Sequence, residues 1–367
     1  MAAKRAAIEL IGVTKRFRTI TALRNVTLTV FDGEYLVVLG PTGAGKSTLL
    51  KVIAGIHYPD RGKVLVYGRD MTRVPPEWRG IAYFPQNYAL FPHLTVLENV
   101  TYGLRARGIS ESDARKRALE VLRMVLLHER TESYPHELSG GMQQRLALAR
   151  ALVTASGILL LDEPLAALDA ILRLELRYEL RRIAKRLRLT VLHVTHDHEE
   201  ALSIADRIVV LRRGEVVQVG TPQQIYEQPA DILVSCLIGE VNVLDGIVHS
   251  VENEYAIITI DKLVLRARRG KLKLHQPVTV VIRPEWVFVR KQRQGTPWEW
   301  EARVERIYFR GYMSVLDVSV GGLELRVSAP SHMVSGIHEG DTVCVEADAE
   351  RIVVLPYQAR PPELFEL

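Results

Sequence analysis

A glycine-rich segment, GPTGAGKST from Gly40 to Thr48, restricts the fold of this chain more than any other feature. It fits the pattern G-x-x-x-x-G-K-[ST] and lies between an apolar run, YLVVL, and a helix-forming run, STLLKVIA. Glycine lets the backbone curl so that its N–H groups converge on phosphate oxygens. Lys46 then reaches the β- and γ-phosphates, Ser47 coordinates Mg²⁺, and the helix start adds a favourable dipole. The segment predicts a nucleotide site between a strand and a helix.

A second segment, GILLLDEP, supplies two carboxylates at the end of a predicted buried strand. Asp162 ends the strand and can hold the shell of Mg²⁺, while Glu163 follows at the strand tip. A carboxylate placed there can polarise the water that attacks a phosphate. In a chain without a phosphate loop, the same pair would be an ordinary surface turn. Beside the loop at Gly40–Thr48, the two acids indicate hydrolysis.

Short apolar runs alternate with helical patterns through residues 1 to about 235. Strands are predicted at 35–40, 157–162, 190–195 and 207–214, and helices at 47–54, 111–126 and 141–153. This alternation predicts an α/β fold with a mainly parallel sheet.

An amphipathic helix is expected over 173–189, because apolar residues recur there at helical spacing. They are Leu172, Leu176, Leu180, Ile183 and Leu187. The arginines between them are expected to form the solvated face of the helix.

From about residue 240 the sequence consists of strand-forming runs cut by Gly, Pro and charged turns. Gly321-Gly322 between two such runs predicts a hairpin. We therefore expect an all-β domain at 237–367, with one or two small barrels, after a first domain at 1–236. A helical subdomain is expected within the first domain at about 88–150.

Composition limits the classes of function. The two cysteines, Cys236 and Cys344, are far apart, which fits a reducing compartment and excludes a cysteine zinc site. No uncharged apolar run reaches the length of about 18 residues that spans a bilayer, so work at a membrane would require another chain. A net charge of +5 permits contact with nucleic acid or an anionic membrane without showing either.

The segment HVTHDHEEA holds three histidines, His193, His196 and His198, near Asp197. Imidazole is a common ligand of transition metals, so the cluster by itself permits a zinc site. Which function these side chains have depends on the remaining motifs.

The segment LSGGMQQRLALARAL at 138–152 lies between the phosphate loop and LLLDEP, and in that order it resembles the signature motif of ATP-binding-cassette (ABC) ATPases. Other elements of that family follow: Phe17 in TKRF, Gln86 in YFPQN, Asp169 in AALDA and His196 in HVTHDH. The β-rich tail resembles the regulatory OB-type domain of the importer branch. The resemblance implies a P-loop ATPase cassette with a mainly parallel sheet and a helical subdomain, followed by an all-β OB-like domain.

The resemblance also assigns roles to single residues. It implies a catalytic role for Glu163, Lys46, Gln86 and His196. In this reading His196 would contact the γ-phosphate and would not bind zinc. Mg²⁺ would be bound by Ser47, Asp162 and Gln86. ATP would be bound by Phe17, by Gly40, Pro41, Thr42, Gly43, Ala44, Gly45, Lys46, Ser47 and Thr48, and by Ser139, Gly140, Gly141, Gln143 and Asp169.

A dimer follows from the same resemblance, because a phosphate loop covers only one side of ATP. The SGG turn offers a second helix N-terminus, so each Ser139 would close on the nucleotide of the partner, with two ATPs held head to tail. The residues Gln86–Val100 would form a groove for a membrane permease, or would merely pack two subdomains together. The chain is expected at the cytoplasmic face of the membrane as a peripheral subunit, served indirectly by an extracytoplasmic solute-binding protein.

Import is weighed against a soluble ABC ATPase that acts on nucleic acid or ribosomes. The single cassette and the lack of basic residues interleaved with aromatics in the tail argue against that alternative, so no nucleic acid is expected. The tail either binds cargo or a regulator, or only stabilises the dimer. The cargo stays open, with polyamine, iron(III) and inorganic oxyanion favoured slightly over sugar.

Overall fold

The chain divides into two units, Met1–Pro222 and Gln223–Leu367, in a computed structural model that describes residues 5–155 and 157–360. The division lies after residue 222, before the boundary expected between residues 236 and 237. The segment 223–236 belongs to the second unit because it packs on that unit. Helix α8 (Ile232–Leu237) places Ile232 against Val281 and Leu355. The buried Arg283 donates to the carbonyl of Tyr226 at 3.0 Å. The first contact reaches two strands of the tail, and the second reaches Arg283, which directly follows one of them.

The first unit contains a six-stranded sheet in the order β10-β9-β3-β8-β7-β6. The strands are β3 (Tyr35–Leu39), β6 (Ile81–Phe84), β7 (Ile158–Asp162), β8 (Thr190–Val194), β9 (Arg207–Arg212) and β10 (Glu215–Gly220). Neighbours from β9 to β6 are parallel, and β10 is antiparallel to β9. Every residue of β3, β7 and β8 is buried, as expected of parallel strands covered on both faces. The predicted strands and their parallel pairing are confirmed.

An antiparallel sheet of four strands packs beside the parallel one, in the order β2-β1-β4-β5. These are β1 (Ala6–Phe17), β2 (Ile20–Phe31), β4 (Arg61–Val66) and β5 (Arg69–Asp70). Side chains of β1, β2 and β4 share one core with β3, β8 and helix α1 (Lys46–Ala54). This core fixes the strand that leads into the phosphate loop.

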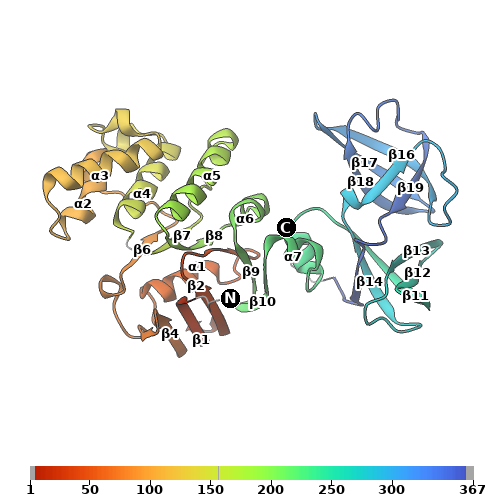
Figure 1. Ribbon diagram of the computed structural model, residues 1–367, viewed down its shortest axis with the longest axis horizontal. Coiled ribbons are helices and arrows are strands. Elements are labelled where there is room, and N and C mark those ends of the chain that lie inside the picture. The colour runs from red at the N-terminus through yellow and green to blue at the C-terminus, as the bar shows by residue number, and fades with distance from the viewer. Residues whose placement is uncertain (1–4, 156, 361–367) are drawn as a thin grey trace. The chain divides into compact units, whose positions relative to one another are not determined.

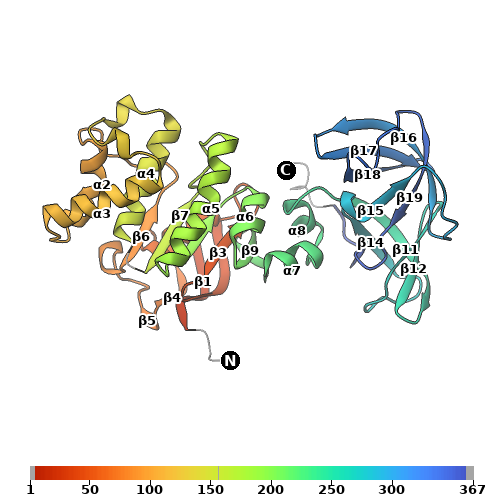
Figure 2. The ribbon, with the colours of Figure 1, turned by 45° about the horizontal axis from the view of Figure 1, so that its top comes forward.

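Helices α2 to α6 of the first unit form two groups (Figure 1). Helices α2 (Val96–Arg105), α3 (Glu111–Met124) and α4 (Gly140–Thr154) pack on one another, as the expected helical subdomain requires. Figure 2 shows α5 (Ala170–Arg186) and α6 (His198–Ile204) together over the parallel sheet. Among the described residues, no helix combines the length and the apolar character that crossing a membrane requires.

The arginines of α5 correct one prediction. Leu176, Leu180 and Ile183 are buried as expected, but the arginines do not form a purely solvated face. Arg177 is 6% exposed and lies 3.2 Å from Asp197, and Arg181 binds Asp206 at 3.0 Å. These contacts form because the loops after β8 and α6 return to the same face of the helix.

The predicted end of this helix is also wrong. Leu187 was expected on the apolar face, but α5 ends at Arg186, and Leu187 is its C-cap with 51% of its surface exposed.

The second unit begins with the short helices α7 (Pro222–Glu227) and α8 and is otherwise mainly β. One sheet has the order β13-β12-β11-β14-β20 and the other β15-β19-β16-β17-β18. The first holds β11 (Asn242–Glu252), β12 (Tyr255–Ile260), β13 (Leu263–Arg268), β14 (Pro277–Ile282) and β20 (Val353–Pro356). The second holds β15 (Val287–Arg290), β16 (Trp300–Phe309), β17 (Met313–Val320), β18 (Leu323–Pro330) and β19 (Thr342–Ala347).

The two sheets of the second unit share one apolar core, so they form a single β domain. The pairing of Val320 with Leu323 confirms the hairpin predicted at Gly321-Gly322. Both glycines have positive φ, 59° and 96°, which explains why glycine occupies the turn.

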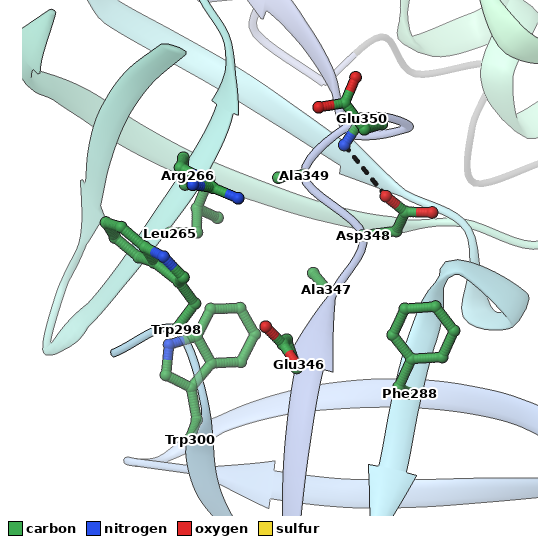
Figure 3. A pocket seen from close by; sticks show the side chains of 10 residues that line it. All are labelled: Leu265, Arg266, Phe288, Trp298, Trp300, Glu346, Ala347, Asp348, Ala349 and Glu350. Carbon is green, nitrogen blue, oxygen red and sulfur yellow. Dashed lines mark hydrogen bonds between the residues drawn. The ribbon is translucent and has the colours of Figure 1, made fainter. Parts of the chain in front are cut away.

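A cavity of about 190 Å³ opens between the two sheets of this β domain. Figure 3 shows Trp298 and Trp300 on one side of it and Phe288 on the other, with Glu346 between them. Each carboxylate in its lining already contacts an arginine outside the lining. The pairs are Glu346 with Arg290, Asp348 with Arg351, and Glu350 with Arg268.

The arginine row on α5 yields a test of stability. Replacing Arg177 by Met leaves Asp197 without its closest cation, so we expect the first unit to lose about 2 kcal/mol of unfolding free energy. Arg182→Met on the same helix should leave the unfolding free energy nearly unchanged, because Arg182 is 76% exposed and its ion pair with Glu179 lies at the surface. Urea unfolding followed by circular dichroism measures both, and equal losses would contradict the assignment.

Candidate active site

The phosphate loop follows β3 and leads directly into α1, as the sequence predicts. The side chain of Lys46 crosses the loop, and its Nζ donates to the carbonyl oxygens of Gly40 at 2.7 Å and Pro41 at 2.9 Å. Burial lowers the pKa of Lys46, while the nearby carboxylates of Glu163 and Asp162 raise it. The charges of both acids that the sequence assigned to the site therefore favour the ammonium form of Lys46.

Two glycines of the loop have no room for a side chain. A Cβ on Gly40 would lie 2.2 Å from the carbonyl oxygen of Leu211, and one on Gly45 would lie 2.3 Å from that of Ala22. Gly45 also caps α1 with φ of 101°, a conformation that residues with a side chain rarely adopt. Close backbone packing thus shapes the loop.

Asp162, at the end of β7, lies beside the first turn of α1. Ser47 Oγ donates to its Oδ1 at 2.9 Å, and the hydroxyl of Tyr83 donates to Oδ2 at 3.3 Å. Asp162 is 1% exposed, and this burial raises the pKa of its carboxyl group. The two hydrogen bonds lower the pKa, but burial has the larger effect. Burial also raises the pKa of Tyr83, so this phenol stays a hydrogen-bond donor. Tyr83 is a site residue that the sequence analysis missed.

The oxygens around Asp162 suit Mg²⁺, which prefers a few hard oxygen ligands from the protein together with phosphates and water. Ser47 and Asp162 supply such a pair, 2.9 Å apart. The described ranges contain no group of three or more His, Cys, Asp or Glu residues arranged for a metal. Gln86, the third predicted ligand, is exposed in the turn that follows β6.

Glu163 lies one residue beyond β7 in a strained backbone conformation, with φ of 52°. Its N–H donates to the carbonyl of Val194 at 2.9 Å, which ties the turn to the end of β8. Oε1 of its side chain lies 3.5 Å from Nδ1 of His196, which follows β8. The neighbouring strands β7 and β8 therefore bring together the two groups that the sequence assigned to the γ-phosphate.

The other histidines of the cluster have separate surroundings. His193 is fully buried inside β8, where Nδ1 lies 3.0 Å from the hydroxyl of Tyr35 and Nε2 lies 3.4 Å from Oε1 of Glu200. Burial lowers its pKa, so the ring stays neutral. His198 begins α6. The cluster thus contributes one side chain, His196, to the candidate site.

The remaining predicted residues lie on other surfaces. Ser139 is exposed and caps α4, where its Oγ accepts from the N–H of Met142 at 3.4 Å, and Gly140 and Gly141 form the first turn. Gln143 Nε2 donates to the carbonyl of Pro135 at 2.9 Å. Asp169 caps α5, and Phe17 packs its ring edge-on against His57 at 5.1 Å.

A second glutamine of the signature segment reaches the catalytic turn instead. Gln144 is 1% exposed, its Nε2 donates to the carbonyl of Glu163 at 3.2 Å, and its Oε1 accepts from the N–H of Ala167 at 3.1 Å. Gln144 is a further site residue that was not predicted, because no local pattern in the sequence distinguishes it from Gln143.

The chain resembles known proteins along most of its length. Residues 23–166 match the ABC transporter family, and residues 280–355 match the TOBE domain. The spermidine/putrescine import ATP-binding protein PotA of Aggregatibacter actinomycetemcomitans is 42% identical over 286 residues, 77% of each chain. The Fe(3+) ions import ATP-binding protein FbpC of Brucella abortus (strain 2308) is 44% identical over 284 residues, 77% of this chain and 80% of the other.

The chain belongs to the ATP-binding subunits of ABC importers. Among solved structures, the dimeric structure of MJ0796, a bacterial ABC transporter cassette, is similar with a TM-score of 0.56 and 35% identity, covering 59% of this chain and 98% of that one. This ABC subunit is therefore an ATPase with a cassette followed by a β-rich TOBE domain, as its sequence predicts.

The phosphate loop of this ABC subunit allows a test with a matched glycine. Gly45→Ala places a methyl group against the carbonyl of Ala22, so we expect ATP affinity to fall by roughly tenfold or more. In Gly43→Ala the added methyl group meets open space, and only the backbone strain at φ 76° remains. The loss of ATP affinity should therefore be smaller than for Gly45→Ala. Titration with a fluorescent ATP analogue measures both affinities, and a loss of equal size would contradict the role given to close packing.

Proposed function

We propose that two copies of this subunit bind two ATP molecules between them, head to tail, and that hydrolysis drives import. The observation that carries the proposal is that, within one chain, Ser139 lies apart from the other residues of the site. Ser47, Asp162, Glu163 and His196 gather at the ends of β3, β7 and β8, whereas Ser139 is exposed at the start of α4. The similar cassette MJ0796 is described as dimeric, and once as a post-hydrolysis state bound to ADP and Pi.

Each side chain has a role that its position supports. Lys46 and the N–H groups of the phosphate loop hold the β- and γ-phosphates, and Ser47 with Asp162 holds Mg²⁺, which would neutralise phosphate charge. Glu163 orients a water molecule and accepts its proton as the water oxygen bonds to the γ-phosphorus. The bond between that phosphorus and the bridging oxygen breaks, so ADP and phosphate leave. His196 contacts the γ-phosphate and supports Glu163, and Ser139 of the partner covers the open side.

Glu163→Gln tests this assignment. The amide cannot accept the proton of the water, so the hydrolysis rate should fall by about 10²–10⁴-fold while ATP affinity stays the same. Glu199→Gln is a matched control, because this acid in the first turn of α6 is 75% exposed and lies 3.9 Å from Arg177. Phosphate release and ATP titration measure the two quantities. Normal turnover by Glu163→Gln would refute the proposed role.

We further propose that a groove next to β6 receives a membrane permease. A cavity of about 300 Å³ is lined by residues of the Gln86–Val100 region, of α2 and of α4. Phe91 packs on Tyr102 with ring centroids 4.5 Å apart, and the guanidinium of Arg150 lies 4.3 Å from the Phe91 ring centroid. Tyr83 lines the same cavity and binds Asp162. This hydroxyl links the groove to the Mg²⁺ ligands, and Gln86 follows three residues later.

The relatives guide the remaining proposals. Two of them are described as importing spermidine/putrescine or Fe(3+) ions, so a polyamine or iron(III) is the proposed cargo. Such cargo would be delivered by an extracytoplasmic solute-binding protein. The subunit would act at the cytoplasmic face of the membrane, bound to its permease. A function in nucleic-acid metabolism finds no support among these import proteins.

Tyr102→Glu tests the groove. Tyr102 is 52% exposed and lines the cavity, so a charge there should reduce the permease recovered with the tagged subunit by roughly tenfold. Trp78→Glu changes an aromatic residue that is 75% exposed and outside the lining, and should leave recovery unchanged. Pull-down from detergent-solubilised membranes with mass spectrometry measures the ratio. Full recovery with Tyr102→Glu would reject the groove, and recovery of ribosomal partners alone would reject import.

A further inference from the structure

We infer that Gln144 is a positioning residue that connects the signature turn at Ser139 to the catalytic Glu163 of the same chain. This inference rests on the roles proposed above for Ser139 and Glu163. In the proposed dimer, Ser139 contacts the ATP of the partner whereas Glu163 serves the ATP of its own chain. Gln144 would then couple the two ATP sites.

The amide of Gln144 is held at both ends. Its Nε2 donates to the carbonyl of Glu163 and its Oε1 accepts from the N–H of Ala167, so both bonds go to the turn that follows β7. If the amide were turned over, its Nε2 would face the N–H of Ala167, donor against donor, and its Oε1 would face the carbonyl of Glu163, acceptor against acceptor. Both hydrogen bonds would then be lost. Because the residue is 1% exposed, water cannot easily replace them.

The turn that Gln144 holds needs such support. Glu163 has φ of 52°, a strained conformation for a residue with a side chain, which persists only where surrounding contacts fix it. Its N–H is fixed by β8 through Val194 and its carbonyl by α4 through Gln144. A change in either contact alters the direction of the carboxylate that must orient the water molecule.

Helix α4 also contacts this turn through its first residues. A Cβ built on Gly141 would lie 3.3 Å from the side chain of Leu168, so the signature turn packs closely on the segment that follows Glu163. Ser139 caps the helix, and Gln144 lies five positions further along. A shift of α4 caused by contact at Ser139 would therefore move Gln144 together with Glu163 and Ala167.

The neighbouring glutamine has a different orientation. Gln143 donates to the carbonyls of Pro135 and Leu138, which precede the helix, and not to the catalytic turn. Successive residues of a helix point about 100° apart, so one glutamine stabilises the signature turn and the next reaches the catalytic one. The shared position on α4 makes these two contacts parts of one rigid element.

The experiment compares Gln144→Met with Gln144→Glu in the full chain. Methionine keeps the length of the side chain but removes both hydrogen bonds, whereas glutamate retains the acceptor for the N–H of Ala167. The control is Thr101→Val, which removes a buried hydrogen bond from Thr101 to the carbonyl of Leu97 inside α2. Thermal unfolding shows whether each variant is folded at the assay temperature.

We expect Gln144→Met to lower the maximal hydrolysis rate by about tenfold or more, equivalent to about 1.4 kcal/mol. ATP affinity and the fraction of dimer formed with a non-hydrolysable ATP analogue should change less than twofold. The Hill coefficient for ATP should fall from above one towards one, with Gln144→Glu between wild type and Gln144→Met. If Gln144 had only a structural role, Gln144→Met would lower the hydrolysis rate, the ATP affinity, the dimer fraction and the unfolding temperature together.

Three results would overturn the inference. One is a rate for Gln144→Met equal to that of Thr101→Val, and another is a parallel loss of ATP affinity. The third is a Hill coefficient of one for the wild type, which would leave no coupling to explain. Glu163→Gln, assayed beside these variants, separates the two claims. If it hydrolyses ATP normally, the proposed function fails, and if it is inactive while Gln144→Met matches the control, only the inference fails.

Discussion

The hydrogen bond between Ser47 and Asp162 is the contact on which the rest of the site depends. It joins the first turn of α1 to the end of β7, although 115 positions separate the two residues in the chain. The bond forms because β3 and β7 are both neighbours of β8 in one parallel sheet, so that their ends meet at one edge. Tyr83 from β6 and His196 from beyond β8 reach the same edge. The sheet thus brings the phosphate loop, the acid and the histidine together at one edge.

The sequence predicts those parts of the fold and site that depend on local pattern. The buried strands, the phosphate loop at Gly40–Thr48, the acids at the end of β7 and the turn at Gly321-Gly322 each have a short signal, and the structure has each at its predicted place. Tyr83 and Gln144 have none, because their hydrogen bonds depend on which strand neighbours β7 and on how α4 packs. The arginines of α5 were misassigned for the same reason, since Asp197 and Asp206 approach them only through the fold.

The exposed position of Ser139 explains why one chain supplies only part of the proposed site. Its N–H groups at the start of α4 can bind an anion, but in this chain Ser139 Oγ binds only its own helix among the described residues. Lys46, Ser47 and Asp162 surround the other side of the proposed nucleotide. Two copies related by a twofold axis would complete both sites at once. The activity of the subunit should then depend on its association.

The dependence of hydrolysis rate on subunit concentration tests this central claim most directly. If each site needs Ser139 of a second copy, the rate per chain at saturating ATP should rise with concentration and level off once the dimer is complete. The subunit concentration at which the rate per chain begins to rise should be lower when the subunit is bound to its permease. A rate per chain that stays constant down to concentrations at which the protein is monomeric by light scattering would contradict the account, because one chain would then hydrolyse ATP alone.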